Sequence, residues 1–226
     1  MHLKEMTIST TVGHLVCVLM MFIESDSEDS NAGCLTIREP YDKGVLLSGL
    51  LTDSHIDFAI DILRRQHPHI DGLETPLLSQ SSRGFSVPSK VKHVVQIHHL
   101  GAHWATSYRP ANMEEVYVYD SLRSHNSRRE PIIVPSFKTQ LRQLYGSLGK
   151  TLTVYYPTTT QQRNFTDCGV FAVAFAVDLC AGFDPARREY EHSNMRHHIA
   201  DCFQLGSLRQ FPSTGERTPT VFTLLL

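Results

Sequence analysis

The segment from Gly169 to Cys180 constrains the fold more than any other part of the chain, because nearly all of its residues are apolar and alanine recurs through it. In a helix such a run is apolar on nearly every side, so it predicts a buried helix rather than a surface helix. Cys168 directly precedes the run and is expected to cap its N-terminus. There the unpaired backbone amides and the helix dipole favour a thiolate over a neutral thiol.

Two β-prone segments upstream place a histidine and an aspartate at strand ends. Residues 94–100 are apolar and β-branched, and an extended pattern resumes at His103 after the break at Gly101, so we expect His103 to begin a strand. Residues 116–120 form another β-prone run, and Asp120 closes it. If these strands are antiparallel neighbours, His103 and Asp120 lie close together.

Together these residues can make a cysteine nucleophile. A thiol attacks a carbonyl only as the thiolate, so it needs an imidazole beside it and a carboxylate that fixes the imidazole's tautomer. His103 and Asp120 are the candidates for these two roles. The side-chain amide of Gln162 and the backbone N–H of Cys168 are the candidate donors to the oxyanion.

Other residues compete for each of these roles. His98 and His99 are alternative bases, and Gln161 is the alternative oxyanion donor. Asp120 could simply end a strand, as aspartate often does. We interpret Asp167 as a structural or capping carboxylate rather than a further catalytic group.

The last predicted helix carries a weak indication of a metal site. His197, His198 and Cys202 could approach one ion from a single helix face, but the sequence offers no clear fourth ligand. We therefore predict that the protein holds no metal. Cys180 and Cys202 are interpreted as packing residues.

These elements together resemble a known family. His103-Trp104, then Asp120 seventeen positions after the histidine, and Gln162 six positions before Cys168-Gly169 are similar to the ubiquitin-like-protein-specific protease family, which includes the SUMO-specific proteases. The chain order of histidine, aspartate and cysteine distinguishes this family from papain itself, in which the cysteine comes first. Within the family, the chain most resembles divergent, transposon-associated animal members.

The resemblance covers about residues 45 to 212. It includes Leu51-Thr52-Asp53-Ser54-His55-Ile56, which is similar to the family's Trp-Leu-Asn-Asp signature, and the closing segment 194–212. It implies an α+β, papain-like cysteine peptidase fold. In that fold a central mixed or antiparallel sheet is flanked by helices, with the nucleophile at the N-terminus of a buried helix.

The resemblance also implies an activity and a partner. A family member hydrolyses the bond after the C-terminal Gly-Gly of a ubiquitin-like modifier, without a cofactor, and SUMO is the modifier that the resemblance favours. Two tryptophans of the family enclose the glycine tail, and Leu50 and Trp104 hold their positions here. Asp53 is the third expected substrate-binding residue. Two alternatives stay open, namely a module that binds a ubiquitin-like protein without cleaving it and a deubiquitinating or general cysteine peptidase.

The chain is long enough for one catalytic domain. With 226 residues and 41% apolar content it can bury a sizeable core. We assign this domain to residues 44–212 and expect it to be a monomer. Residues 1–43 are interpreted as an apolar arm followed by an acidic, serine-rich linker, and the arm is too short to cross a membrane. The tail 213–226 is predicted to be an edge strand or disordered.

Charge and cysteine content narrow the function further. A net charge of −2 and the absence of long basic runs argue against nucleic-acid binding. Five unevenly spaced cysteines without a CxxC motif argue against a disulfide framework, so we expect a reducing compartment, the nucleus or the cytoplasm. The longest basic runs are arginine pairs that we interpret as solvated faces: Arg64-Arg65, Arg128-Arg129 and Arg187-Arg188.

Helices are also expected outside the nucleophile region. Thr52 or Asp53 can cap a helix that has a regular apolar face and ends before Pro68. Further amphipathic helices are expected between residues 135 and 148 and around Met195. Residues 72–92 are rich in Ser, Pro and Gly and predict a loop.

Overall fold

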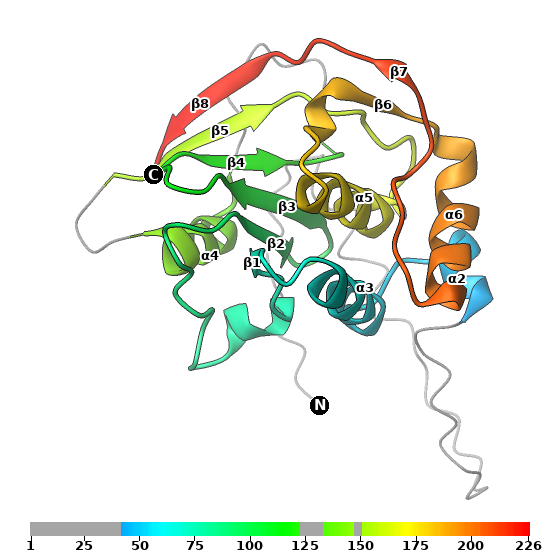
Figure 1. Cartoon of the computed structure of the whole chain (residues 1–226), viewed down its shortest axis with the longest axis horizontal. Coiled ribbons are helices and arrows are strands. Elements are labelled where there is room, and N and C mark those ends of the chain that lie inside the picture. Colours follow the sequence, from blue (N-terminus) through cyan, green and yellow to red (C-terminus); the bar gives the residue numbers. More distant parts are fainter. Residues whose placement is uncertain (1–41, 123–132, 147–150) are drawn as a thin grey trace, which may run out of the picture. The chain divides into compact units, whose positions relative to one another are not determined.

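The described part of the chain is built around a central six-stranded sheet (Figure 1). The computed structural model describes residues 42–122, 133–146 and 151–226, and all of them belong to the unit Ile37–Leu226. The strand order in the sheet is β1-β2-β3-β4-β5-β8. The strands are β1 (Asp71–Gly72), β2 (Val94–His99), β3 (Trp104–Arg109), β4 (Val116–Tyr119), β5 (Thr153–Pro157) and β8 (Val221–Leu225).

The sheet is mixed. The pairs β1–β2 and β4–β5 are parallel, whereas β2–β3, β3–β4 and β5–β8 are antiparallel. The predicted antiparallel pairing of the strands next to His103 and Asp120 is therefore confirmed, with Thr106 opposite Tyr119. A separate two-stranded sheet pairs β6 (Arg188–Tyr190) with β7 (Ser213–Glu216).

Helices cover both faces of the central sheet. On one face, Val95 and Ile97 pack in the same core as α3 (Asp53–Gln66) and α5 (Cys168–Cys180). On the other face, Ala105 and Val118 pack with α4 (Pro135–Tyr145). The structure thus confirms the expected α+β architecture of a central mixed sheet flanked by helices. The remaining helical elements are α2 (Lys43–Ser48), η2 (Pro76–Gln80), η3 (Pro185–Arg187) and α6 (His192–Leu205).

Helix α5 is the buried helix that the sequence predicts. Every residue from Cys168 to Cys180 is buried, which explains why this helix has no polar face. Thr106 on β3 donates its hydroxyl to the carbonyl of Ala172 at 2.9 Å and so ties the helix to the middle of the sheet. One detail of the prediction is wrong, because Cys168 is the first helical residue and Asp167 occupies the N-cap position.

Helix α3 begins at a capping box. Thr52 is the N-cap residue, and its hydroxyl lies 2.7 Å from Nδ1 of the fully buried His55. The face carrying Ile56, Ala59 and Leu63 is buried, as the periodicity predicts. The C-terminal end of α6 is equally regular, since Gly206 adopts a left-handed conformation (φ 63°) that glycine tolerates best.

The last fourteen residues supply strands to both sheets. β7 pairs with β6, and β8 pairs with β5 over five register positions from Thr153–Leu225 to Pro157–Val221. Phe222 and Leu224 of β8 pack against the core on the α4 side of the sheet. Of the two alternatives for the apolar end of the chain, the structure adopts the edge strand.

Two further expectations need correction. Residues 72–92 are not entirely loop, because Asp71–Gly72 pairs with β2 and Pro76–Gln80 is a 3-10 turn. Arg188 is not on a solvated face, since its guanidinium forms a 3.0 Å ion pair with the fully buried Asp178.

Arg128-Arg129 and the N-terminal arm and linker up to residue 41 lie outside the described residues. Among the described helices, none has the length and apolarity that a bilayer span requires.

Candidate active site

His103 and Asp120 meet because β3 and β4 are antiparallel neighbours. His103 lies immediately before β3 and Asp120 immediately after β4. Because these strands are antiparallel, the two residues lie at the same end of the strand pair. Nε2 of His103 lies 2.7 Å from Oδ1 of Asp120, which is a charge-assisted hydrogen bond when the ring is protonated. This contact leaves Nδ1 as the ring nitrogen available to a nucleophile.

Cys168 supplies the third group. Its side chain, in the first turn of α5, interacts electrostatically with the imidazole of His103, and the residue is 1% exposed. Nδ1 of His103 is buried and receives no well-formed hydrogen bond from any described residue. Nδ1 is therefore the ring nitrogen left to face the thiol of Cys168, as a cysteine–histidine pair requires.

The environment of His103 favours the imidazolium form. Burial lowers the pKa of this ring, but hydrogen bonds to Asp120 and Cys168 and the negative charges of these two groups outweigh it and raise the pKa to about 10. An imidazolium between a carboxylate and a thiolate is the charge distribution of an activated cysteine nucleophile.

Asp120 is held in place by its neighbours. The backbone N–H of Leu122 donates to the same Oδ1 atom at 2.9 Å, and the carbonyl of Asp120 accepts from Thr159 Oγ1 at 2.7 Å and from Gln161 Nε2 at 3.0 Å. These bonds fix both the carboxylate and the main chain behind it. The sequence gives no signal for Thr159, because its contact depends on how the loop after β5 returns to β4.

The amide of Gln162 is also fixed. Its Oε1 accepts from Ser121 Oγ at 2.7 Å, and its Nε2 donates to the carbonyl of Asn164 at 2.6 Å. A glutamine amide has two N–H groups, so one remains for a further acceptor. Gln161, the alternative donor, uses its amide on Asp120 and Thr159 instead.

The competing histidines have other environments. His98 is fully buried, with Nδ1 3.0 Å from Gln140 Oε1 and Nε2 2.7 Å from Ser107 Oγ. Burial lowers its pKa to about 4, the hydrogen bond to Gln140 acting weakly in the opposite direction, so the ring is a neutral core residue at ordinary pH. His99 stacks on Trp104 with ring centroids 4.4 Å apart.

Leu50, Trp104 and Asp53 lie near one another around this site. The indole N–H of Trp104 donates to the carbonyl of Leu51 at 3.2 Å, so the segment that carries Leu50 is anchored to the tryptophan. Leu50 is 52% exposed, whereas Trp104 is 5% exposed and has one face covered by His99. Oδ1 of Asp53, 3.9 Å from Nδ1 of His99, is buried and makes no hydrogen bond to a described residue.

Gly169 permits the close approach of this segment to α5. A Cβ atom at Gly169 would lie 2.8 Å from Cβ of Leu51, which is closer than real side chains come. The Cys-Gly pair therefore has a packing reason: the residue after Cys168 must be small so that Leu51 can lie against the start of α5.

The turn before Cys168 is held by the side chains of Asn164, Asp167 and Arg196, of which only Asp167 is expected from the sequence to have a structural role. Oδ1 of Asn164 accepts from the backbone N–H groups of Thr166 and Asp167, both at 3.0 Å, and Nδ2 of Asn164 donates to Asp167. Arg196 of α6 forms an ion pair with the same carboxylate. A lone arginine in an amphipathic helix carries no sequence signal of this role.

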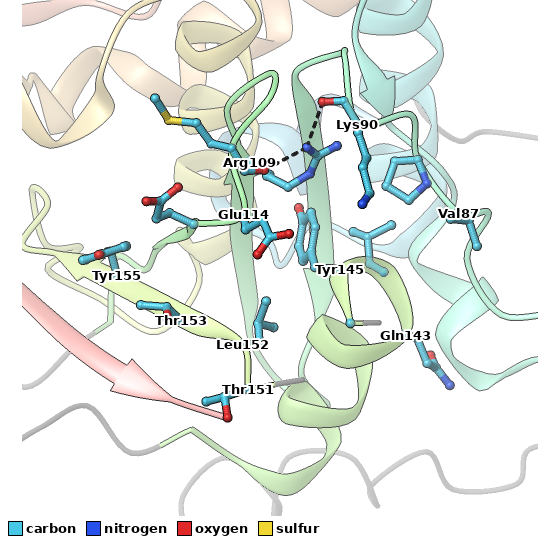
Figure 2. Close-up of a pocket in the computed structure, with 15 residues that line it drawn as sticks. Val87, Lys90, Arg109, Glu114, Gln143, Tyr145, Thr151, Leu152, Thr153 and Tyr155 are labelled. Atoms are coloured by element: carbon cyan, nitrogen blue, oxygen red, sulfur yellow. Dashed lines mark hydrogen bonds between the residues drawn. The ribbon is translucent and has the colours of Figure 1, made fainter. Parts of the chain in front are cut away.

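The other candidate features lie apart from this site. Cys202 has its Sγ 3.4 Å from Nε2 of His198, but the described residues contain no group of three or more potential ligands arranged to hold a metal ion. A pocket of about 370 Å³ (Figure 2) opens where β3 ends and β4 begins. The His103–Asp120 pair lies at the other end of these two strands. Arg109 at its edge is already bonded to backbone carbonyls, including that of Lys90 at 3.2 Å.

The chain is similar to known proteins in sequence and in fold. Residues 78–205, more than half of the chain, match the model of the family described as the Ulp1 protease family, C-terminal catalytic domain. A comparison with curated proteins gave no significant match.

Solved structures are similar in fold. The C-terminal Ulp1 protease domain in complex with Smt3, the yeast ortholog of SUMO, has a TM-score of 0.55 and 18% identity and covers 74% of this chain and 83% of that chain. The SUMO protease Ulp1 with its catalytic cysteine oxidised to a sulfinic acid has a TM-score of 0.54 and 17% identity, covering 74% and 84%. A de-sumoylating protease has a TM-score of 0.50 and 15% identity, covering 73% and 84%.

Proposed function

Because the chain belongs to the Ulp1 protease family of cysteine peptidases, we propose that it hydrolyses the bond after the C-terminal Gly-Gly of a ubiquitin-like modifier. A SUMO-like protein is the first candidate, since a similar catalytic domain has been solved in complex with the yeast ortholog of SUMO. The observation that carries the proposal is the 2.7 Å contact of His103 with Asp120 beside the thiol of Cys168.

The chemistry follows from the positions of the groups. The Cys168 thiolate attacks the carbonyl of the last glycine, and the tetrahedral oxyanion accepts from the Cys168 backbone N–H and from Gln162 Nε2. The His103 imidazolium gives its proton to the leaving amine, which leaves a thioester on Cys168. A water molecule, deprotonated by His103, then hydrolyses the thioester and restores the starting ion pair. Asp120 orients the ring in both steps.

The substrate tail is proposed to lie between Leu50 and Trp104. Glycines need the least room, and the anchoring of Leu51 to the indole N–H keeps the two walls together. The buried Oδ1 of Asp53 is available to accept a hydrogen bond from the tail. Selection of glycine would then come from the width of the passage and from an extended backbone held near the thiol.

The oligomeric state, the partner and the cell compartment of the protein are also proposals. All of the proposed catalytic groups come from one chain, which is consistent with a monomer acting on a modifier or its conjugates. We propose that it acts in the nucleus or cytoplasm, where thiols stay reduced.

The test is a panel of modifier proteins that carry an electrophile in place of the last carboxylate. The full chain is incubated with SUMO, NEDD8 and ubiquitin probes, and adducts are located by peptide mass spectrometry. We expect an adduct on Cys168 with the SUMO probe first, and none with Cys168→Ala. Labelling of all three modifiers at equal rates would favour a broader peptidase, and binding of SUMO without any adduct or cleavage would favour a recognition module.

A further inference from the structure

Arg196 joins the turn before Cys168 to helix α2. Its guanidinium forms an ion pair with Asp167, donates from Nη2 to the carbonyl of Thr166 at 2.9 Å, and donates from Nη1 to the carbonyls of Val45 at 3.2 Å and Leu46 at 2.9 Å. The side chain is 12% exposed. All of these contacts are tertiary, because they connect the middle of α6 to parts of the chain far away in sequence.

The geometry of arginine suits this position. The planar guanidinium can donate in several directions at once, whereas a lysine ammonium at the end of a flexible stem cannot reproduce the fork. Thr166 and Asp167 lead directly into Cys168, and α2 leads through Gly49 into Leu50. A single side chain therefore fixes the turn that carries the nucleophile relative to the segment that carries the proposed tail wall.

Arg196 also balances the negative charge of Asp167 at the start of α5. Asp167 is the N-cap residue directly before Cys168, and its carboxylate is 13% exposed. An uncompensated carboxylate in this position disfavours a neighbouring thiolate, because the two negative charges repel each other where solvent screens them poorly. The guanidinium cancels that charge. Other charged or titratable groups in this part of the molecule include His103, Asp120, Arg163, Glu189 and His192.

We propose that Arg196 is a positioning residue of the peptidase, which holds the Thr166–Asp167 turn and the α2 segment in one arrangement and neutralises Asp167 beside the reactive thiol. This inference rests on the proposed function, in that it assigns a role for the same reaction. Orientation of the turn and neutralisation of Asp167 are two separate effects, and different substitutions remove them.

The experiment compares three variants of the full chain, Arg196→Gln, Arg196→Lys and the double variant Arg196→Gln with Asp167→Asn. Two quantities are measured in each. The first is the rate of alkylation of Cys168 by iodoacetamide as a function of pH, resolved by peptide mass spectrometry, which needs no modifier substrate. The second is kcat and KM for cleavage of a SUMO-like precursor.

Arg196→Gln should lower kcat on the order of 10- to 100-fold with little change in KM, because misplacement of a reacting group is a positioning effect. Its alkylation midpoint should move to higher pH by roughly one unit, because Asp167 is left uncompensated. The double variant should recover the alkylation midpoint but not kcat. Arg196→Lys should keep the midpoint and recover only part of kcat, since it retains the charge but not the fork.

A matched control separates these effects from general loss of stability. Arg188 forms a comparable ion pair with the buried Asp178, away from the nucleophile, and Arg188→Lys should lower the melting temperature without moving the alkylation midpoint. All rates are taken well below the melting temperature of each variant.

The outcomes distinguish the two proposals. An unchanged kcat and an unchanged alkylation midpoint in folded Arg196→Gln would overturn the role of Arg196, even if the wild-type chain cleaves SUMO. If the wild-type chain cleaves no modifier but the midpoints shift and recover as described, the charge role of Arg196 stands and the proposed function fails. A midpoint shift in Arg188→Lys as large as the shift in Arg196→Gln would reduce Arg196 to a structural residue.

Discussion

At the scale of single residues, the hydrogen bond between His103 and Asp120 predicts how kcat/KM depends on pH. Burial alone would lower the pKa of His103, but the bonds and charges of Asp120 and Cys168 raise it from 6.5 to about 10. Asp120→Asn removes the carboxylate charge, so the pKa should fall. The alkaline limb of kcat/KM should therefore move to lower pH, and kcat/KM at pH 7 should drop on the order of 100- to 10,000-fold. An alkaline limb that stays in place would contradict this assignment of the pair.

The same pKa has a consequence for stability. Because the folded-state pKa lies above the ordinary value of 6.5, the protonated ring contributes stability that is fully present below about pH 6.5 and is lost as the pH rises through about 10. Asp120→Asn should therefore flatten the decline of the melting temperature over this range. The His98 ring, with a pKa of about 4, acts in the acidic range instead and serves as an internal comparison.

Gln162 allows a second prediction at this scale. One of its two amide N–H groups is occupied by the carbonyl of Asn164, and the other is the proposed oxyanion donor. Gln162→Ala should lower kcat on the order of 100- to 1,000-fold and leave KM nearly unchanged. Gln161→Ala is the control and should have a smaller effect, because its amide supports Asp120 through the backbone. The opposite ranking in steady-state kinetics would assign the donor role to Gln161.

At the scale of elements, the start of α5 and the segment before α3 are packed too closely for a side chain at position 169. In Gly169→Ala the new Cβ would lie 2.8 Å from Leu51 Cβ, so that segment must move. We expect a loss of about 1–3 kcal/mol in the free energy of unfolding, and a fall in kcat/KM because Leu50 moves with its neighbour. Gly215→Ala is the control, since it has open space around it. Chemical denaturation and steady-state kinetics measure the two effects.

Unaltered kcat/KM in a destabilised Gly169→Ala variant would show that the position of Leu50 does not matter for the tail. The sequence predicts α5 from its own composition, but the requirement for Gly169 comes from Leu51, which is distant in the chain and close in space.

At the scale of the whole molecule, the C-terminal residues belong to the fold around the site. β8 pairs with β5, the strand that leads into the Gln161–Gln162 loop, and Leu224 packs on the core while Leu225 is 70% exposed. Truncation after residue 212 should therefore lower the melting temperature by at least ~5 °C, since a loss of a few kcal/mol shifts the midpoint of a domain of this size by that amount. Thermal unfolding by circular dichroism measures it.

Two substitutions in β8 make the test more specific. Leu224→Ser should reproduce part of the loss, whereas Leu225→Ser should be nearly neutral because its side chain faces solvent. A truncated chain as stable as the full chain would place the domain boundary at residue 212, as the sequence resemblance suggests.

The sequence by itself determined the features that depend on local order and short spacing. The apolar run 169–180 is a buried helix wherever it packs, the β-branched runs are strands, and the placement of His103 and Asp120 at strand ends follows from the breaks next to them. Those facts and the motif spacing were sufficient for the fold class and for the family.

Only the tertiary structure decided which side chains support the site. Three ordinary polar residues of the sequence do so: Thr159 bonds to Asp120, Ser121 to Gln162, and Arg196 to the Thr166–Asp167 turn. Their contacts form only when distant elements are packed together. The position of β8 was likewise undecided, because an edge strand pairs through its backbone and carries little sequence signal. Local periodicity fixes elements, whereas hydrogen-bond partners depend on how the elements meet.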